Sequence, residues 1–270
     1  MAATPAAALS VLTNPHLLHM LVEYADGVPH ELHLYIQSQY MPKLSSLPVL
    51  DFAASEGHLW MLQLCADRRC DKAVTSSGMD AAASNGHLET VKWLHARQTP
   101  CTVWAMNGAA KRGHLEVVKF LHEHRSEGCT IFAMHNAIVH NHLNVVKYLQ
   151  TNRTEGCTSY SLVRAAQLGY LDVVKFLHET RRQGSSGRQA MDIAATNGHL
   201  DIVKYMHEHN DQGCTTQAID GAAQNGHFEV VKFLHTHREE GFTELGVSMA
   251  QMNGHHAIAD YLMQERRAEA

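Results

Sequence analysis

The sequence predicts an all-α solenoid of about eight short helical hairpins, with capping helices at both ends. The first observation is a Gly-His-Leu motif, or a close variant, that occurs eight times between residues 57 and 256 at intervals of 27–29 residues. The second is a Gly or Asn at the start of every copy, where a left-handed backbone can end a helix. The third is an apolar stripe at helical spacing after each copy. Such regular repeats are typical of stacked supersecondary units.

Each repeat is predicted to hold two short helices on either side of this Gly or Asn. A Thr precedes the first helix, and its hydroxyl can accept a hydrogen bond from an orphan backbone N–H. The predicted caps are Thr102, Thr130, Thr158 and Thr215. The second helix begins with an acidic residue, followed three positions later by Lys, as at Glu116 and Lys119. This order suits the helix dipole and an i,i+3 ion pair.

An aromatic residue follows this Lys, and we expect its ring to pack between repeats. The residues concerned are Trp93, Phe120, Tyr148, Phe176, Tyr205 and Phe233.

The composition excludes several classes of function. The 270 residues are 45% hydrophobic and 18% charged with a net charge of −5, which argues against a disordered chain and a general nucleic-acid-binding surface. No run of about 18 apolar residues occurs, and no Lys or Arg precedes the apolar stretch in residues 1–10, so we expect neither a membrane span nor a signal peptide. Six Cys residues without a secretory signal favour a cytoplasmic location, with the nucleus as an alternative.

The repeat core is clearest at residues 107–118, Asn-Gly-Ala-Ala-Lys-Arg-Gly-His-Leu-Glu-Val-Val. This segment resembles the Ala-Ala-x-x-Gly-His-x-Glu-Val-Val core of the ankyrin repeat family, and the match recurs through residues 46–267. The repeats depart from the family in length, because they are about five residues shorter than the standard 33. The shortening falls between Leu121 and Phe132, where the family carries its projecting β-hairpin, so we expect little strand. Asp also replaces the family's usual His at Asp51, Asp80, Asp192 and Asp220.

The resemblance implies a non-catalytic interaction module or scaffold, expected to be a monomer, that binds a partner protein on its concave face. In the family, this groove is lined by the start of each first helix and by the residues after the paired Ala. Three consecutive repeats carry an aromatic residue in this region, which would give a stripe about 20 Å long at helix spacings of ~8–10 Å. The candidate protein-binding residues are Val103, Trp104, Asn107, Lys111, Arg112, Ile131, Phe132, His135, His140, Ser159, Tyr160, Arg164, Leu168 and Arg188.

The aromatic residues have a second interpretation. Trp104, Phe132 and Tyr160 are either exposed anchors for a partner, of the kind that dominates interface energetics, or core side chains buried between first helices.

Residues 1–45 do not follow the repeat and contain two helical patterns, near 15–24 and 29–40. We expect them to form an N-terminal helical cap that packs on Leu59, Leu62 and Leu64. Alternatively, residues 12–21 resemble the first helix of an F-box, which would make the protein a substrate adaptor of a ubiquitin ligase. Binding of the F-box-binding ligase subunit to residues 1–45 would distinguish the two. The charged residues 260–267 are a predicted C-terminal cap, and residues 268–270 a tail.

The repeated Cys residues are interpreted as structural. Cys101, Cys129 and Cys157 recur every 28 residues, but equivalent positions in adjacent repeats are ~8–10 Å apart, beyond the reach of a disulfide. We therefore expect buried thiols.

The 22 His residues are also interpreted as structural. One set follows the helix-breaking Gly or Asn and is expected to hydrogen-bond the turn; another ends the second helix, where a cation is favoured. Protonation of all of them would change the net charge from −5 to +17, so we expect stability or solubility to fall below about pH 5.5. No dinucleotide, Walker or zinc-protease motif is present, so we expect no enzyme activity, metal or cofactor.

Overall fold

A computed structural model describes residues 49–67, 73–155, 159–180, 186–209 and 212–269. The chain divides into two compact units, residues 1–129 and 130–270. Within the described residues there are sixteen α-helices and no strand, which confirms the predicted all-α hairpin fold. None of these helices has the length and apolar character needed to span a membrane. The predicted N-terminal cap and F-box-like segment, both within residues 1–45, lie outside the described residues.

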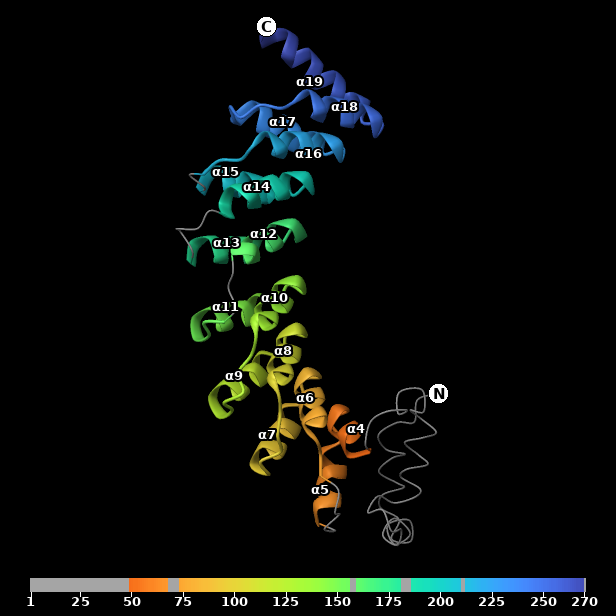
Figure 1. Ribbon diagram of the computed structural model, residues 1–270, viewed down its shortest axis with the longest axis vertical. Helices are drawn as coiled ribbons and strands as arrows, with labels where there is room; N and C mark the ends of the chain where they lie inside the picture. The colour runs from red at the N-terminus through yellow and green to blue at the C-terminus, as the bar shows by residue number, and fades with distance from the viewer. Residues whose placement is uncertain (1–48, 68–72, 156–158, 181–185, 210–211, 270) are drawn as a thin grey trace. The chain divides into compact units, whose positions relative to one another are not determined.

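The described part of the first unit contains three helical hairpins (Figure 1). The first helices of these hairpins pack side by side, and the second helices form an adjoining row. The hairpins are α4 (Val49–Ser55) with α5 (Leu59–Asp67), α6 (Ser76–Ser84) with α7 (Leu88–Ala96), and α8 (Val103–Lys111) with α9 (Leu115–His124).

The second unit repeats this arrangement in five hairpins. They are α10 (Ile131–Val139) with α11 (Leu143–Asn152), α12 (Ser159–Leu168) with α13 (Leu171–Thr180), α14 (Ser186–Thr196) with α15 (Leu200–His209), α16 (Thr216–Gln224) with α17 (Phe228–His237), and α18 (Glu244–Met252) with α19 (His256–Glu269). Helix α19 includes the residues predicted to form the C-terminal cap.

The local signals act as predicted at both ends of the first helices. The hydroxyl oxygens of Thr102, Thr130 and Thr215 accept hydrogen bonds from backbone N–H groups two residues later, at 3.1–3.3 Å. The predicted cap Thr158 lies outside the described residues. After the first helix, the chain turns through a left-handed residue in each repeat, and Asn141 does so with φ 57° where the other repeats have Gly. Asn tolerates this conformation better than most residues with a side chain.

Apolar residues of both helices form the core. The paired Ala of the first helix and the Val-Val-x-x-Leu of the second, as in Val117, Val118 and Leu121, are almost fully buried. Of the six aromatic residues predicted to pack between repeats, Tyr205 is buried and the other five are partly buried. Both helices of each hairpin therefore contribute apolar side chains to the core between repeats.

The predicted i,i+3 ion pairs form where the acid is Glu in the first unit. Glu89 with Lys92 and Glu116 with Lys119 are each 2.8 Å apart. In the second unit the Lys ammonium groups of Lys175 and Lys204 instead lie 5.7 Å from aromatic ring centroids of the next repeat. No ion pair joins Glu229 and Lys232 of α17 among the described residues either, so a Glu at this position is not sufficient for the predicted pair.

A recurrent hydrogen-bonded pair joins neighbouring first helices, which we call the Asp–Thr clamp. In it, an Asp of one first helix accepts one hydrogen bond from the backbone N–H and one from the hydroxyl of the Thr that caps the next first helix. The four clamps are Asp51–Thr75, Asp80–Thr102, Asp192–Thr215 and Asp220–Thr243, with distances of 2.5–2.9 Å. Hydrogen bonds to a charged acceptor are among the stronger ones, so the clamp fixes both the cap and the spacing of adjacent repeats.

Candidate protein-binding surface

Three exposed aromatic side chains mark the first helices of consecutive repeats. Trp104 is 60% exposed, Phe132 50% and Tyr160 54%. Each is the second residue of its helix, two positions after the capping position, in α8, α10 and α12. The alternative that these rings are buried between first helices is therefore wrong. Trp104 belongs to the first unit, whereas Phe132 and Tyr160 belong to the second.

Several other predicted binding residues are also accessible near these rings. In the first unit, Lys111 and Arg112 at the end of α8 are exposed, and Val103 is partly exposed. In the second unit, Ile131 is 52% exposed at the start of α10. His140 is exposed just after that helix, and its Nδ1 lies 2.9 Å from the carbonyl oxygen of Asn136. Both ends of α10 therefore present accessible side chains.

The remaining predicted residues of the second unit differ in their accessibility. His135, Arg164 and Leu168 are partly exposed, and Arg188 is exposed. Ser159 begins α12, and its side chain lies outside the description.

Asn107 requires a correction, because it is only 1% exposed and does not offer its side chain to a partner. The reason is the register of the first helix. Asn107 occupies the helix position held by Asp51 and Asp192, which are 1% and 8% exposed and form clamps. Asn107 therefore belongs to the packing between first helices, although His135 at the same position of α10 stays partly exposed.

The clamps themselves were not predicted from the sequence. The Asp residues were noticed only as departures from the family, and the Thr residues only as helix caps. The signal in the sequence that could have revealed the Asp–Thr pairs is the separation of 22–24 residues between Asp and Thr, which recurs in the four repeats that contain the Asp. The three repeats with an exposed aromatic residue carry Asn107, His135 and Val163 in place of the Asp.

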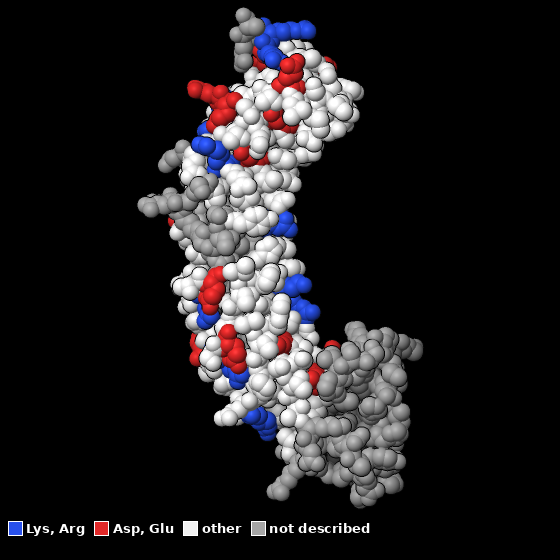
Figure 2. Space-filling model, in the orientation of Figure 1, with Lys and Arg blue, Asp and Glu red and all other residues white. Residues whose placement is uncertain are grey.

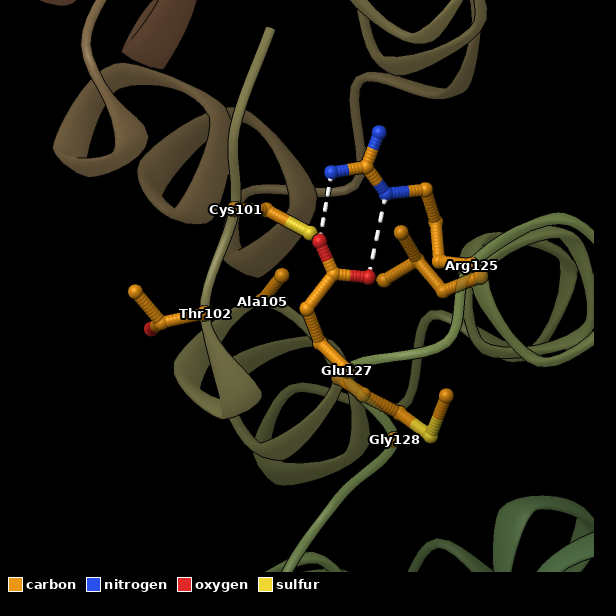
Figure 3. A pocket seen from close by; sticks show the side chains of 8 residues that line it. Cys101, Thr102, Ala105, Arg125, Glu127 and Gly128 are labelled. Atoms are coloured by element: carbon orange, nitrogen blue, oxygen red, sulfur yellow. Dashed lines mark hydrogen bonds and ion pairs between the residues drawn. The ribbon is translucent and has the colours of Figure 1, made fainter. Parts of the chain in front are cut away.

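The described Cys residues are buried, as predicted, whereas Cys157 lies outside the described residues. Cys65, Cys101, Cys129 and Cys214 are all buried thiols. Cys101 lines a tightly filled cavity, with no room for a water molecule, together with Arg125 and Glu127 (Figure 3). Burial raises the pKa of its thiol to about 11. A thiol with so high a pKa is a poor nucleophile at neutral pH, so this cavity has no sign of a reactive centre.

The Arg and Glu beside this Cys form a recurrent ion pair in the loop between repeats. The Nε and Nη2 atoms of Arg125 donate to the two carboxylate oxygens of Glu127 at 3.2 and 2.6 Å. Arg153 with Glu155 and Arg238 with Glu240 form the same pair. The hydrogen bond from Arg238 is the main reason that the pKa of Glu240 falls to about 2. These guanidinium groups are therefore used to hold the loops in place.

The His residues after the turn pack on the preceding repeat. In the second unit, His227 lies against Gly198, so closely that a Cβ on this Gly would come within 2.5 Å of the imidazole Nδ1. In another repeat, the Nε2 atom of His199 is 3.0 Å from the carbonyl oxygen of Gln167. This contact confirms the predicted hydrogen bond to the turn. Burial lowers the pKa of His227, and the neighbouring His199 lowers it further.

The His residues at the end of the second helix contact aromatic rings of the next repeat, a role that the sequence did not predict. His95 meets Phe120 edge to face at 5.4 Å, and His207 meets Phe233 in the same way at 5.5 Å. Where the ring is Tyr205, its hydroxyl lies 3.3 Å from Nδ1 of His178. In the part of the chain that the structure describes, no group of three His, Cys, Asp or Glu side chains is arranged to hold a metal ion.

Comparison with known proteins identifies the repeats. Residues 78–160 match a family described as ankyrin repeats (3 copies), and residues 162–207 match one described as ankyrin repeats (many copies). A search of curated proteins found no match. The matched residues run from α6 to α15 and include the three exposed aromatic residues. The repeated hairpins, their turn motif and these matches together show that residues 78–207 consist of ankyrin repeats.

Proposed function

We propose that the protein is a non-catalytic scaffold that binds a partner protein through exposed aromatic side chains of its first helices, Phe132 and Tyr160 in the second unit and Trp104 in the first. Ankyrin repeats are in general protein–protein interaction modules. The open face of the first helices corresponds to the concave face that the family uses for binding. Aromatic side chains contribute much of the energy at protein interfaces, because they bury a large rigid surface with few rotatable bonds.

The observation that carries this proposal is a difference between repeats at a single helix position. The residue is exposed in every case, but it is Ser77, Gln189 or Gln217 in other repeats. The hairpin therefore forms with a polar residue at this position, and folding does not require an aromatic ring there. Three large rings left half exposed are better explained by a partner that covers them than by a role in the core.

A site-specific photo-crosslinking experiment tests the proposal in the full chain. Benzoylphenylalanine replaces Tyr160 in one variant and Gln217, the equivalent residue of α16, in another. Both sites are exposed at the same helix position, so they differ only in the repeat that carries them. We expect a discrete crosslinked protein from position 160, and from positions 104 and 132, but not from 217.

The proposal fails if position 160 yields no crosslinked protein, or if position 217 yields the same product in equal amount. A second control at Leu245 checks for simple hydrophobic adhesion, because it is 67% exposed at the same helix position in α18. A crosslinked product as strong from 245 as from 160 would likewise contradict a site confined to the aromatic repeats.

A further inference from the structure

The first-helix face of the second unit combines exposed aromatic rings with arginines that form no ion pair with a carboxylate among the described residues. From α10 to α14 it presents Phe132, Tyr160, Arg164 and Arg188. These helices are neighbours, since α12 packs against both α10 and α14. The apolar and the cationic side chains therefore lie within one compact unit, on consecutive first helices.

Arg164 of α12 and Arg188 of α14 differ in their hydrogen bonds from the arginines of the loops between repeats. Arg125, Arg153 and Arg238 are each paired with a Glu two residues later. By contrast, Nη1 of Arg164 donates to the side-chain oxygen of Gln167 at 2.7 Å, and Nε of Arg188 donates to the carbonyl oxygen of Gln212 at 3.1 Å.

Neither of these bonds neutralises the guanidinium charge. The Nε atom of Arg164 is buried without a hydrogen-bond acceptor. Within the described residues, no carboxylate forms an ion pair with Arg164 or Arg188. The Nη2 group of Arg164 and most of the donors of the exposed Arg188 thus remain for a ligand, although Arg188 is also attracted electrostatically to Asp192 without forming an ion pair with it.

Acidic side chains on this face are already occupied. The only Asp or Glu in α10, α12 and α14 is Asp192, which is 8% exposed. Both of its oxygens accept hydrogen bonds from Thr215. The next acid, Asp220 of α16, is held by Thr243 in the same way. The accessible charge of the first helices α10, α12 and α14 is therefore positive, although the whole chain carries a net charge of −5.

We propose that this face binds an acidic peptide segment of the partner, in which apolar side chains contact Phe132 and Tyr160 while Asp or Glu side chains pair with Arg164 and Arg188. The inference rests on the proposed function and names the chemistry of its partner. Carboxylates form two parallel hydrogen bonds with a guanidinium group. Adjacent first helices are ~8–10 Å apart, and an extended peptide spans ~3.3 Å per residue. Apolar residues about three positions apart would therefore reach both rings.

A nucleic acid is the less favoured ligand. Single strands also stack on aromatic rings, but they are bound in grooves with many positive charges along the backbone. On the face drawn in Figure 2, the described surface is mostly uncharged, and residues of both signs are interspersed. Two arginines are enough for one or two carboxylates, and too few for a phosphate backbone.

The test is a selection of random twelve-residue peptides displayed on phage against the immobilised full chain. The selected peptides are then synthesised with a fluorescent label, and their affinities are measured by fluorescence anisotropy. We expect them to combine Asp or Glu with Leu or aromatic residues. Replacing their acids by Asn and Gln, or raising the salt from 50 to 500 mM, should weaken binding at least fivefold. Selection of Lys- or Arg-rich peptides, or of none, would overturn the proposal, as would tighter binding of a single-stranded oligouridine.

Variants of the protein locate the binding site and separate the two levels of the proposal. Arg188→Gln alone, and with Arg164→Gln, should weaken the acidic peptide about fivefold or more. Lys232→Gln, an exposed charge on α17, should not. If the selected peptides are neutral and lose binding to a Phe132→Gln/Tyr160→Gln variant, the proposed protein-binding surface stands and the proposed recognition of acidic peptides is wrong. Binding that needs Arg188 but neither ring would reject the combined site. Unchanged melting temperatures would show that the variants are folded. Arg188→Gln is the single variant less expected to disturb folding, because Arg188 is exposed whereas Arg164 is partly buried.

Discussion

The two ends of the second unit join their repeats by different means. From α14 to α18, the clamps of Asp192 and Asp220 tie each first helix to the cap of the next. In α10 and α12, His135 and Val163 stand at the same helix position. The repeats from α14 to α18 are therefore joined by pairs of Asp–Thr hydrogen bonds, whereas α10 and α12 have no carboxylate at the same helix position.

The turns differ in the same way. In the clamped region, His227 packs on Gly198. In the other region, Asn141 replaces the Gly and Tyr170 replaces the His, with the Tyr170 hydroxyl donating to the carbonyl oxygen of Val139 at 3.3 Å.

The comparison separates what the repeat needs for folding from what it carries in addition. Both regions form the same hairpins, so the clamp is one solution to repeat packing and not a condition for it. The region without Asp is also the region with Phe132 and Tyr160 exposed, whereas the clamped repeats have Gln189 and Gln217 there. We infer that repeats 130–180 are specialised for binding and the clamped repeats from α14 to α18 for stability.

The largest predicted effect comes from breaking a clamp. Asp192→Ala leaves the backbone N–H and the hydroxyl of Thr215 without their acceptor, and hydrogen bonds to a charged group each contribute about 1.5–3 kcal/mol. Burial raises the pKa of Asp192 and so offsets part of this contribution. We therefore expect a loss of about 2–3 kcal/mol in the free energy of unfolding, measured by urea denaturation.

Asp172→Ala is the matched control for this variant. Asp172 is exposed at the start of α13, so its removal affects only the helix dipole and should cost less than about 0.5 kcal/mol. Equal losses in the two variants would show that the clamp contributes nothing specific to the stability of this region.

A moderate effect is expected from pH. Burial lowers the pKa of His227 below its ordinary value of 6.5. Between the folded and unfolded pKa values the unfolded chain binds more protons, so stability is complete above pH 6.5 and falls as the pH decreases through this range. The melting temperature should therefore fall between pH 7.5 and 5.

His227→Tyr, which installs the residue found at Tyr170, should reduce this pH dependence, whereas the exposed variant His209→Gln should change it less. A melting temperature that stays constant from pH 7.5 to 5 would contradict the role assigned to the buried imidazole.

The smallest effect comes from adding one polar bond between repeats. Nδ1 of His207 is buried beside Phe233 without a hydrogen-bond partner, whereas the equivalent His178 meets the hydroxyl of Tyr205. Phe233→Tyr should supply the missing bond and stabilise the protein by about 0.5–1 kcal/mol. Tyr205→Phe should destabilise it by a similar amount. Urea midpoints measure both, and a loss of stability in Phe233→Tyr would be the opposite of the expected result.

Much of the fold could be predicted because its signals are local. The period, the Thr caps and the left-handed turn residue each lie within one hairpin, and together they define the helix boundaries. The clamps could not be predicted in the same way, because Asp192 and Thr215 are 23 residues apart and each has a sufficient local explanation. Only the stacking of repeats brings them together.

The candidate surface shows the same limit. Spacing correctly selected the helix position of Trp104, Phe132 and Tyr160, but the second residue of a helix can face either a neighbour or solvent, so exposure could not be decided from sequence. Asn107 was assigned to the surface because it lies near these residues along the chain. Its burial follows from the register that also buries Asp51, which becomes visible only when the helices are packed.

The most direct test replaces the exposed aromatic residues of α10 and α12 by Gln, the residue found at the same helix position in the clamped repeats. A Phe132→Gln/Tyr160→Gln variant copies Gln189 and Gln217 at equivalent positions, and the partner captured by crosslinking provides the affinity measurement. We predict that affinity falls at least tenfold while the unfolding free energy changes by less than about 1 kcal/mol, since both rings are half exposed. Unchanged affinity, or a loss of stability of about 3 kcal/mol as expected for core aromatics, would contradict the division between binding and stabilising repeats.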